Sequence, residues 1–353
     1  MPVPARGAID CDVHVALPGT QVLVPYLDDY WREHVVTRGL ERDNLDIGAY
    51  PPGSPLSGRP DWRPAKGNPG TDLALLQSQL LDGFGTKFAI LNCLHGAQVI
   101  FGEDLSAALC RAINDWIAAE WLDRDPRLRA SIVIPAHSAE LSAAEIERVA
   151  PDRRFVQVLM LVMGELPLGR RQHWPIYQAA ERHGLPIGVH AGSSYRHAPT
   201  SLGWPSYYLE DYVAQSSGFA GALNSLITEG VFVQFPALKV VLMESGVSWL
   251  PNYMWRATKT WRAARIEVPW NKRSPAELVR EHVRLTTQPF DAPSATEVAR
   301  IVEEIGSDDL LLFSTDYPHW QFDGEDAVPE GIPDALLKKI LVDNPLATYP
   351  RLS

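Results

Sequence analysis

Eight short apolar runs, separated by helical patterns, are the strongest constraint on how this 353-residue chain folds. The runs are rich in Val, Ile and Leu. Their apolarity is continuous rather than alternating, which is typical of parallel strands buried on both faces. A regular alternation of such strands with helices predicts an α/β protein with a (β/α)8 TIM barrel. The runs are residues 8–15, 87–93, 128–135, 155–161, 185–192, 238–245, 283–288 and 310–316.

Helix signals fill the intervals between these runs. Ser274 is predicted to cap a helix over 274–282, with Pro275 in the first turn and Glu277 completing a capping box. A doubly wound open sheet is the structural alternative, but no Gly-rich phosphate loop follows the first run. Helical spacing that ends at Gly or Pro is found at residues 72–85, 104–126 and 174–184.

A single barrel domain accounts for residues 1–353. Two long stretches interrupt the regular alternation of strands and helices: residues 17–70 follow the first strand, and residues 193–216 follow the fifth. Loops that follow barrel strands lie on the carboxyl face, where active sites are built. We therefore expect both insertions to cover the active site, with Trp62 as the aromatic anchor of the first.

Composition excludes several classes of protein. The 32 Lys and Arg residues against 43 Asp and Glu residues give a net charge of −11, which argues against nucleic acid or an anionic membrane as partner. The apolar runs are too short to span a bilayer, and the first residues contain no signal-peptide core. Three cysteines are too few for a disulfide framework or a Cys-rich zinc site. These features predict a cytoplasmic protein with a small-molecule substrate.

Acidic and histidine side chains stand at the ends of four of the predicted strands. The first strand ends in Asp12 and His14, which point the same way because they are two residues apart. The fifth ends in His190, the sixth in Glu244 and the eighth in Asp316. The carboxyl ends of all barrel strands meet at one face. These five side chains are therefore predicted to bind one divalent metal ion.

Each of these residues also has an ordinary structural explanation. Either aspartate could cap a turn, either histidine could be a hydrogen-bonded core residue, and Glu244 could pair with Arg256. Their occurrence on one face of the barrel favours the metal site, because burying unpaired charged groups in a packed core is energetically unfavourable. His319 follows Asp316 by three residues and could be a ligand, a proton donor or a clasp for the loop. Three tryptophans could either line the pocket or pack in the core, namely Trp249, Trp255 and Trp320.

Longer stretches around these residues resemble the amidohydrolase superfamily. The opening Asp-x-His is followed by WPIYQAAERHGLPIGVHAG (174–192), FPALKVVLMESGVSWLP (235–251) and LLFSTDYPHW (311–320). The pattern is most similar to the amidohydrolase-related group that contains aminocarboxymuconate-semialdehyde and resorcylate decarboxylases. The resemblance covers residues 8–349. It implies a catalytic metal held by Asp12, His14, His190 and Asp316.

Several positions depart from the superfamily pattern. Asp12 and Glu244 stand where many members have His, and the fourth strand lacks the Lys that bridges two metals. Gln321 stands where relatives of this kind often have an acid. One ion is therefore expected rather than a bridged pair. Zn is the first choice as the commonest ion of mononuclear sites, and Mn or Fe suits the carboxylate-rich ligands.

The resemblance implies a metal-dependent hydrolase or a non-oxidative decarboxylase acting on a small carboxylate or ring substrate. Asp316 is the expected proton-transfer residue, and Glu244 and His319 are further catalytic candidates. The Asp-x-His opening favours the decarboxylase. Two alternatives remain open: a non-haem iron hydroxylase, and a metal-binding partner subunit of an active paralogue. We accordingly expect a homo-oligomer, or a hetero-oligomer with a paralogous barrel subunit.

Overall fold

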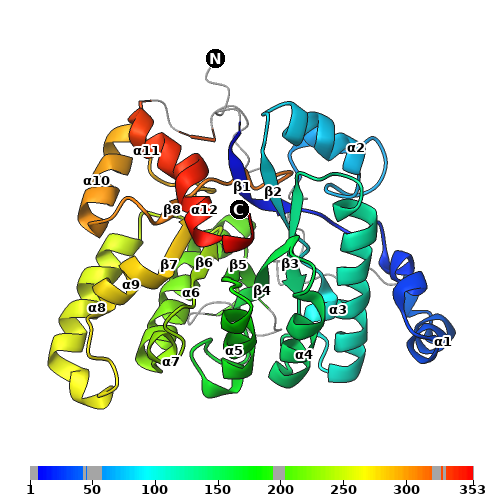
Figure 1. Cartoon of the computed structure of the whole chain (residues 1–353), viewed down its shortest axis with the longest axis horizontal. Helices are drawn as coiled ribbons and strands as arrows, with labels where there is room; N and C mark the ends of the chain where they lie inside the picture. The colour runs from blue at the N-terminus through cyan, green and yellow to red at the C-terminus, as the bar shows by residue number, and fades with distance from the viewer. Residues whose placement is uncertain are drawn as a thin grey trace.

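Eight parallel strands form one sheet in sequence order, which confirms the predicted barrel (Figure 1). The computed structural model describes residues 7–42, 45, 58–193, 203–319, 327–328 and 331–352. Each predicted apolar run corresponds to one strand, and β4 and β5 extend one or two residues beyond their runs. The strands are β1 (Ile9–His14), β2 (Phe88–Asn92), β3 (Leu128–Val133), β4 (Phe155–Met163), β5 (Ile187–Ser193), β6 (Val240–Met243), β7 (Val283–Thr286) and β8 (Leu311–Leu312).

The chain beyond β8 joins the first strand and closes the barrel. Cys11 N donates to Phe313 O over 2.9 Å, and His14 N donates to Tyr317 O over 2.7 Å. Phe313 and Tyr317 lie beyond the end of β8, so the predicted strand over 310–316 was too long. The turns that shorten β8 also place the side chains that follow it over the end of the barrel.

Helices surround the strands in Figure 1. The capping box at Ser274 is confirmed: its side chain accepts from Glu277 N, and the Glu277 side chain accepts from Ser274 N. The predicted helix over 72–85 is α-helical only at its start and continues as a π-helix over Gln77–Asp82. The helices are α1 (Asp29–Arg38), α2 (Leu73–Leu76), α3 (Glu103–Ile117), α4 (Ala139–Val149), α5 (Trp174–Arg182), α6 (Tyr208–Thr228), α7 (Val231–Gln234), α8 (Leu250–Ala264), α9 (Pro275–His282), α10 (Ala295–Ile305), α11 (Asp334–Lys338) and α12 (Asn344–Thr348).

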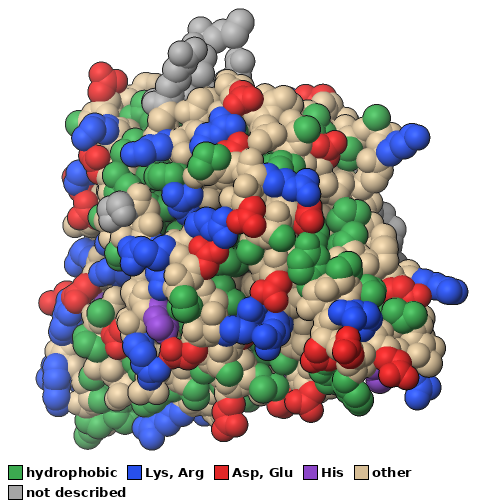
Figure 2. Space-filling model, turned by 45° about the vertical axis from the view of Figure 1, so that its right-hand side comes forward, with side chains coloured by type: hydrophobic (Ala, Val, Ile, Leu, Met, Phe, Trp, Pro, Cys, Tyr) green, Lys and Arg blue, Asp and Glu red, His purple; other side chains and the backbone are tan. Residues whose placement is uncertain are grey.

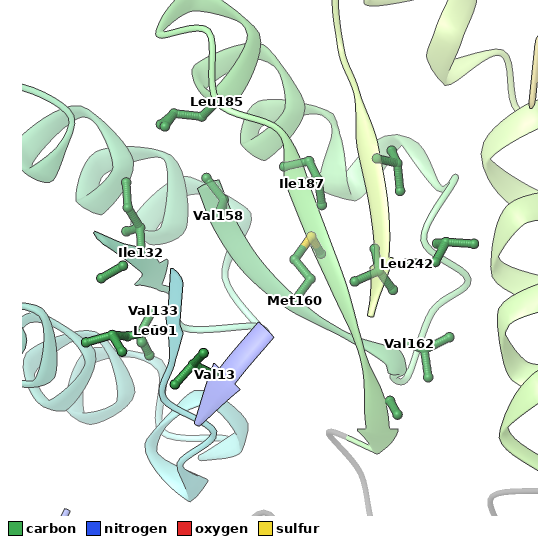
Figure 3. Close-up of a cluster of buried hydrophobic side chains, with 14 of the residues drawn as sticks. Val13, Leu91, Ile132, Val133, Val158, Met160, Val162, Leu185, Ile187 and Leu242 are labelled. Atoms are coloured by element: carbon green, nitrogen blue, oxygen red, sulfur yellow. The ribbon is translucent and has the colours of Figure 1, made fainter. Parts of the chain in front are cut away.

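Apolar side chains pack on both sides of the sheet. The larger layer lies between strands and helices; part of it is shown in Figure 3, where Leu91, Val158, Ile187 and Leu242 are labelled. A smaller cluster includes Ile9, Cys11, Ile90, Val241, Leu312, Tyr349 and Leu352.

The last described residues belong to this smaller cluster. Tyr349 is fully buried and packs with Ile9, the first residue of β1. In Figure 1 the end of the chain, in red, lies against the strands near the centre of the barrel. Tyr349 therefore lies at the amino end of the barrel, opposite the face that carries the polar strand ends.

The first insertion divides into two described parts. Helix α1 lies at the right-hand edge of Figure 1, outside α3, and Tyr26 OH donates to Glu120 Oε1 over 3.2 Å just beyond the end of α3. Residues 58–62 instead reach the carboxyl face, where Arg59 N donates to Pro318 O over 2.9 Å. Trp62 packs edge-to-face on Tyr317 at 5.3 Å between ring centres.

Charged side chains of both signs lie on the surface. In the face shown in Figure 2, acidic and basic side chains are interspersed, so this face carries no large basic patch. Among the described residues, no helix has the length and apolarity needed to cross a membrane.

Candidate metal centre

An irregularity in β1 turns two consecutive side chains toward the inside of the barrel. The strand's register against β2 shifts between Asp10 and Val13. Cys11 packs in the smaller cluster, whereas Asp12 contacts the polar cluster above it. Strict alternation would place these two neighbours on opposite faces. The shift therefore lets β1 contribute both to the core and to the site.

The five predicted ligands come together. His14 Nε2 lies 3.4 Å from Asp12 Oδ1, 3.3 Å from Glu244 Oε1 and 3.1 Å from Asp316 Oδ1. His190 Nε2 lies 3.2 Å from Glu244 Oε1 and 3.3 Å from His14 Nε2. All five residues are buried. Their ligand atoms form two overlapping groups that could each hold an ion: Asp12, His14, His190 and Glu244, and His14, Glu244, Asp316 and His319.

His319 also belongs to the cluster. Its Nδ1 lies 2.7 Å from Asp316 Oδ1 and 3.5 Å from Glu244 Oε1, and its ring stacks on His14 at 4.1 Å between centres. Its side chain is 21% exposed, so His319 lies at the mouth of the cluster. This position allows the ligand and proton-donor roles as well as the clasp.

Charge within the cluster shifts the pKa of several members. Burial alone would lower the pKa of His190, but the carboxylates of Glu244 and Asp12 raise it to about 9. Burial would raise the pKa of Glu244, yet His190 and the hydrogen bonds from His14 and His319 hold it well below its usual range. Burial dominates at Asp12 and raises its pKa. Without a metal, the imidazoles therefore hold protons that partly offset the negative charge.

Two carboxylate oxygens show that this compensation is incomplete. Asp12 Oδ2 and Asp316 Oδ2 are buried and have no hydrogen-bond partner among the described residues. Unpaired carboxylate oxygens are costly away from water, and a divalent cation would satisfy both. His190 Nδ1 lies 2.7 Å from Ala191 O, which fixes the Nδ1–H tautomer in the neutral ring and leaves Nε2 free to bind a metal. The donor set thus fits a divalent ion.

Two of the clustered residues adopt a left-handed backbone conformation. Glu244 has φ 55° and Asp316 has φ 59°, and no other non-glycine residue in the described part of the chain has positive φ. Such a conformation costs about 1–2 kcal/mol per residue. Hydrogen bonds hold it in place: Glu244 N donates to Thr286 Oγ1 over 3.2 Å, and Asp316 N donates to Asp12 O over 3.1 Å.

Asp10 ties the loop of Asp316 to β1. Its carboxylate accepts from Thr315 N over 3.0 Å and from Thr315 Oγ1 over 2.6 Å. Burial raises the pKa of Asp10 to about 7 despite these bonds. The pair joins β1 to the segment after β8, directly beside two of the clustered carboxylates.

Some sequence-based alternatives are wrong. Arg256 does not pair with Glu244; it lies on α8 and lines an outer groove between α6 and α8. Trp255 is exposed on the same helix, and Trp249 Nε1 donates to Ser245 O over 2.9 Å in the turn after β6. Two further positions of interest, Trp320 and Gln321, lie outside the described residues.

Two polar residues near the cluster were missed in the sequence. Asn92 ends β2 and donates from Nδ2 to Asp12 Oδ1 over 2.7 Å. Tyr212 of α6 donates from its hydroxyl to Glu244 Oε2 over 3.3 Å. Asn92 carried a usable signal, because it ends an apolar run as His190 does. Tyr212 carried none, because it lies in a helix within the second insertion.

Comparison with known proteins places this geometry in a family. The sequence matches the amidohydrolase family over residues 9–351, almost the whole chain. The protein belongs to the amidohydrolase family. This result confirms the resemblance inferred from the strand-end motifs.

The similar proteins include several decarboxylases. Gamma-resorcylate decarboxylase of Polaromonas sp. (strain JS666 / ATCC BAA-500) is 27% identical over 255 residues, which cover 69% of this chain and 77% of the relative. The structure of a dihydroxybenzoic acid decarboxylase from Polaromonas sp. JS666, with bound manganese and the inhibitor 2-nitroresorcinol, has a TM-score of 0.69 at 22% identity, covering 99% of this chain and 98% of that one. The structure of 5-carboxyvanillate decarboxylase from Sphingomonas paucimobilis has a TM-score of 0.71 at 20% identity, covering 98% and 99%.

Proposed function

We propose that this protein is a metal-dependent, non-oxidative decarboxylase of hydroxylated aromatic carboxylates. The observation that carries the proposal is the buried cluster of three carboxylates and three imidazoles, with Asp12 Oδ2 and Asp316 Oδ2 unpaired. The similarity to gamma-resorcylate decarboxylase favours decarboxylation over hydrolysis.

The proposed centre holds one divalent ion, bound by Asp12, His14, His190 and Asp316, with Glu244 as a fifth ligand. Manganese becomes the first choice, because carboxylate-rich sites suit Mn²⁺ and a structural relative contains it. Zinc, the ion expected from frequency alone, stays an alternative. An ion held by these residues would supply positive charge opposite the substrate's carboxylate.

The chain's own residues then handle the proton. Asp316 donates a proton to the ring carbon that bears the carboxylate. The electrons of the carbon–carboxyl bond return to the ring, which regains aromaticity as CO2 leaves. His319 Nδ1, 2.7 Å from Asp316 Oδ1, restores the proton to Asp316. The charge of Asp316 and Glu244 raises the pKa of His319 well above its usual range despite its burial, so the ring holds a proton to give.

The insertions are proposed to keep bulk water from this chemistry. The main chain pairs Gly58 with His319, and Trp62 packs on Tyr317 and Phe84. From the second insertion, Tyr212 reaches Glu244. Both insertions thus contact residues at or beside His319, where a cover would limit hydration of the bound substrate.

Product analysis tests the proposal. Purified protein loaded with Mn²⁺ is incubated with 2,6-dihydroxybenzoate and with 5-carboxyvanillate, and chromatography follows the loss of the carboxylate. We expect CO2 and the decarboxylated phenol from at least one hydroxylated benzoate. Asp316→Asn should abolish turnover even where Mn²⁺ is retained, since an amide does not donate a carboxyl proton.

Four results would count against the proposal. Normal turnover by Asp316→Asn would refute the proton-transfer role. Hydrolysis of ester or amide substrates without CO2 release would favour the hydrolase. Two iron ions per chain with oxygen consumption would favour the hydroxylase, and an inert metal-bound protein that activates a paralogue would favour the partner subunit. Light scattering on the same sample measures the oligomeric state.

A further inference from the structure

A row of polar side chains crosses the interior of the barrel beneath the proposed metal centre. Asn92 of β2, Ser131 of β3 and Gln157 of β4 are each fully buried. Their surroundings are the apolar side chains of the smaller cluster, which include Ile90 and Val241. Burying two amides and a hydroxyl there is unfavourable unless they pair with each other, so their presence calls for an explanation.

The hydrogen bonds of this row run in one direction. Tyr349 OH donates to Gln157 Oε1 over 3.1 Å, at the amino end of the barrel. Gln157 Nε2 donates to Ser131 Oγ over 2.8 Å and to Asn92 Oδ1 over 3.2 Å, and Ser131 Oγ donates to Asn92 Oδ1 over 2.5 Å. Asn92 Nδ2 completes the row by donating to Asp12 Oδ1 over 2.7 Å.

This direction is imposed by the two ends of the row. A carboxylate only accepts hydrogen bonds, so the Asn92 amide must turn its NH2 group toward Asp12. The Asn92 oxygen then faces Ser131 and Gln157, which both donate to it. The Gln157 oxygen is left facing the amino end, where Tyr349 OH is its donor. If the amide of Asn92 or Gln157 were flipped, its oxygen would face another oxygen that only accepts hydrogen bonds in this row.

The row leaves the two oxygens of Asp12 in different states. Oδ1 is held by Asn92, whereas Oδ2 has no hydrogen-bond partner among the described residues and lies 3.7 Å from His190 Nε2. We propose that Asn92 is a positioning residue that presents Asp12 Oδ2 to the metal, and that Gln157 and Tyr349 hold the Asn92 amide in that orientation. Through this row, a residue at the closed end of the barrel sets the affinity of the metal centre. The inference rests on the proposed metal site.

Tyr349→Phe tests the inference with the smallest change, because it removes one hydroxyl and keeps the ring. The matched control is Tyr177→Phe, since Tyr177 is equally buried and its hydroxyl donates to Leu168 O, outside the row. Calorimetry with MnCl2 alone gives the dissociation constant, and urea denaturation of the metal-free proteins gives their stability. We expect both variants to lose stability, but only Tyr349→Phe to raise the dissociation constant, by about fivefold.

A change at the other end of the row should have a larger effect. Asn92→Leu removes the direct donor to Asp12 and should raise the dissociation constant for Mn²⁺ by about 10–100-fold, as loss of a ligand's hydrogen-bond partner does elsewhere. Gln157→Met should fall between the two. If Asn92→Leu does not fold, Tyr349→Phe and Gln157→Met still decide the matter.

The outcomes separate this inference from the function on which it rests. Unchanged Mn²⁺ affinity in Tyr349→Phe and Gln157→Met, with normal binding by the parent protein, would overturn the positioning role alone. Equal weakening in Tyr177→Phe would also overturn it, because the effect would then come from general destabilisation. Failure of the parent protein to bind Mn²⁺ would overturn the metal centre itself.

Discussion

Protons and the metal ion should compete for the same nitrogen atoms in this site. His190 has a pKa of about 9 in the metal-free protein, because the carboxylates of Glu244 and Asp12 favour its charged form. An imidazole must lose its proton from Nε2 before that atom can bind a metal. Raising the pH through the range below about 9 should therefore strengthen metal binding.

The size of the effect follows from the shifted pKa. A pH of 7 is about two units below the pKa of His190. Each unit corresponds to about 1.36 kcal/mol in the free energy of removing the proton. Removing the proton thus costs about 3 kcal/mol at pH 7, which weakens metal binding about 100-fold relative to the fully deprotonated ring. The expected slope is about tenfold in affinity per pH unit.

Calorimetric titration with MnCl2 at pH 6.5, 7.5 and 8.5 measures this slope. Repeating each titration in two buffers of different ionisation enthalpy counts the protons released. His183→Gln is a matched control, since His183 also pairs with a carboxylate, at 2.6 Å from Glu147, but lies away from the cluster. The control should keep the full slope. An affinity that stays constant from pH 6.5 to 8.5, or binding without proton release, would refute the competition.

Other perturbations should separate the site from the scaffold. His190→Ala should abolish Mn²⁺ binding in elemental analysis, while circular dichroism still reports a folded barrel. The metal-free protein should lose about 3 kcal/mol of unfolding free energy between pH 6.5 and 9, because the raised pKa of His190 stabilises the fold only while the ring is protonated. Urea denaturation at each pH measures this loss, and saturating Mn²⁺ should remove it. Leu91→Ala should cost about 2–5 kcal/mol of stability and leave the dissociation constant for Mn²⁺ unchanged, because Leu91 packs between strands and helices. Thr315→Val should cost about 1.5–3 kcal/mol by denaturation, since the Asp10 carboxylate loses a hydroxyl donor.

The strands and their polar ends could be predicted for a simple physical reason. A parallel strand buried on both faces needs an unbroken apolar run, and the first polar residue after that run lies at the carboxyl end of the strand. This reasoning placed His190, Glu244 and Asp316 on one face without knowledge of the helices. It failed at the end of β8, which stops at Leu312 instead of continuing to Asp316, and no residue type in that segment signals the change.

Side chains whose position depends on helix rotation could not be predicted in the same way. Arg256 and Tyr212 both belong to long helices outside the barrel, yet only Tyr212 points at the site. His282, at the end of α9, is buried and stacks on Phe232. Which face of a helix meets the barrel depends on its packing against neighbours, and spacing along the sequence does not specify those neighbours.

Closure of the barrel between its first strand and the segment after β8 has a consequence for biosynthesis. The partners of the Asp10–Thr315 pair are 305 positions apart, and Tyr349 follows later still. At about 5–20 residues per second, a ribosome needs about 15–60 s to make the chain between the two partners. During that time β1 has an unpaired edge and Asp12 lacks most of its neighbours. The proposed metal site can therefore form only after residue 316 has been translated, and the polar row beneath it only after residue 349.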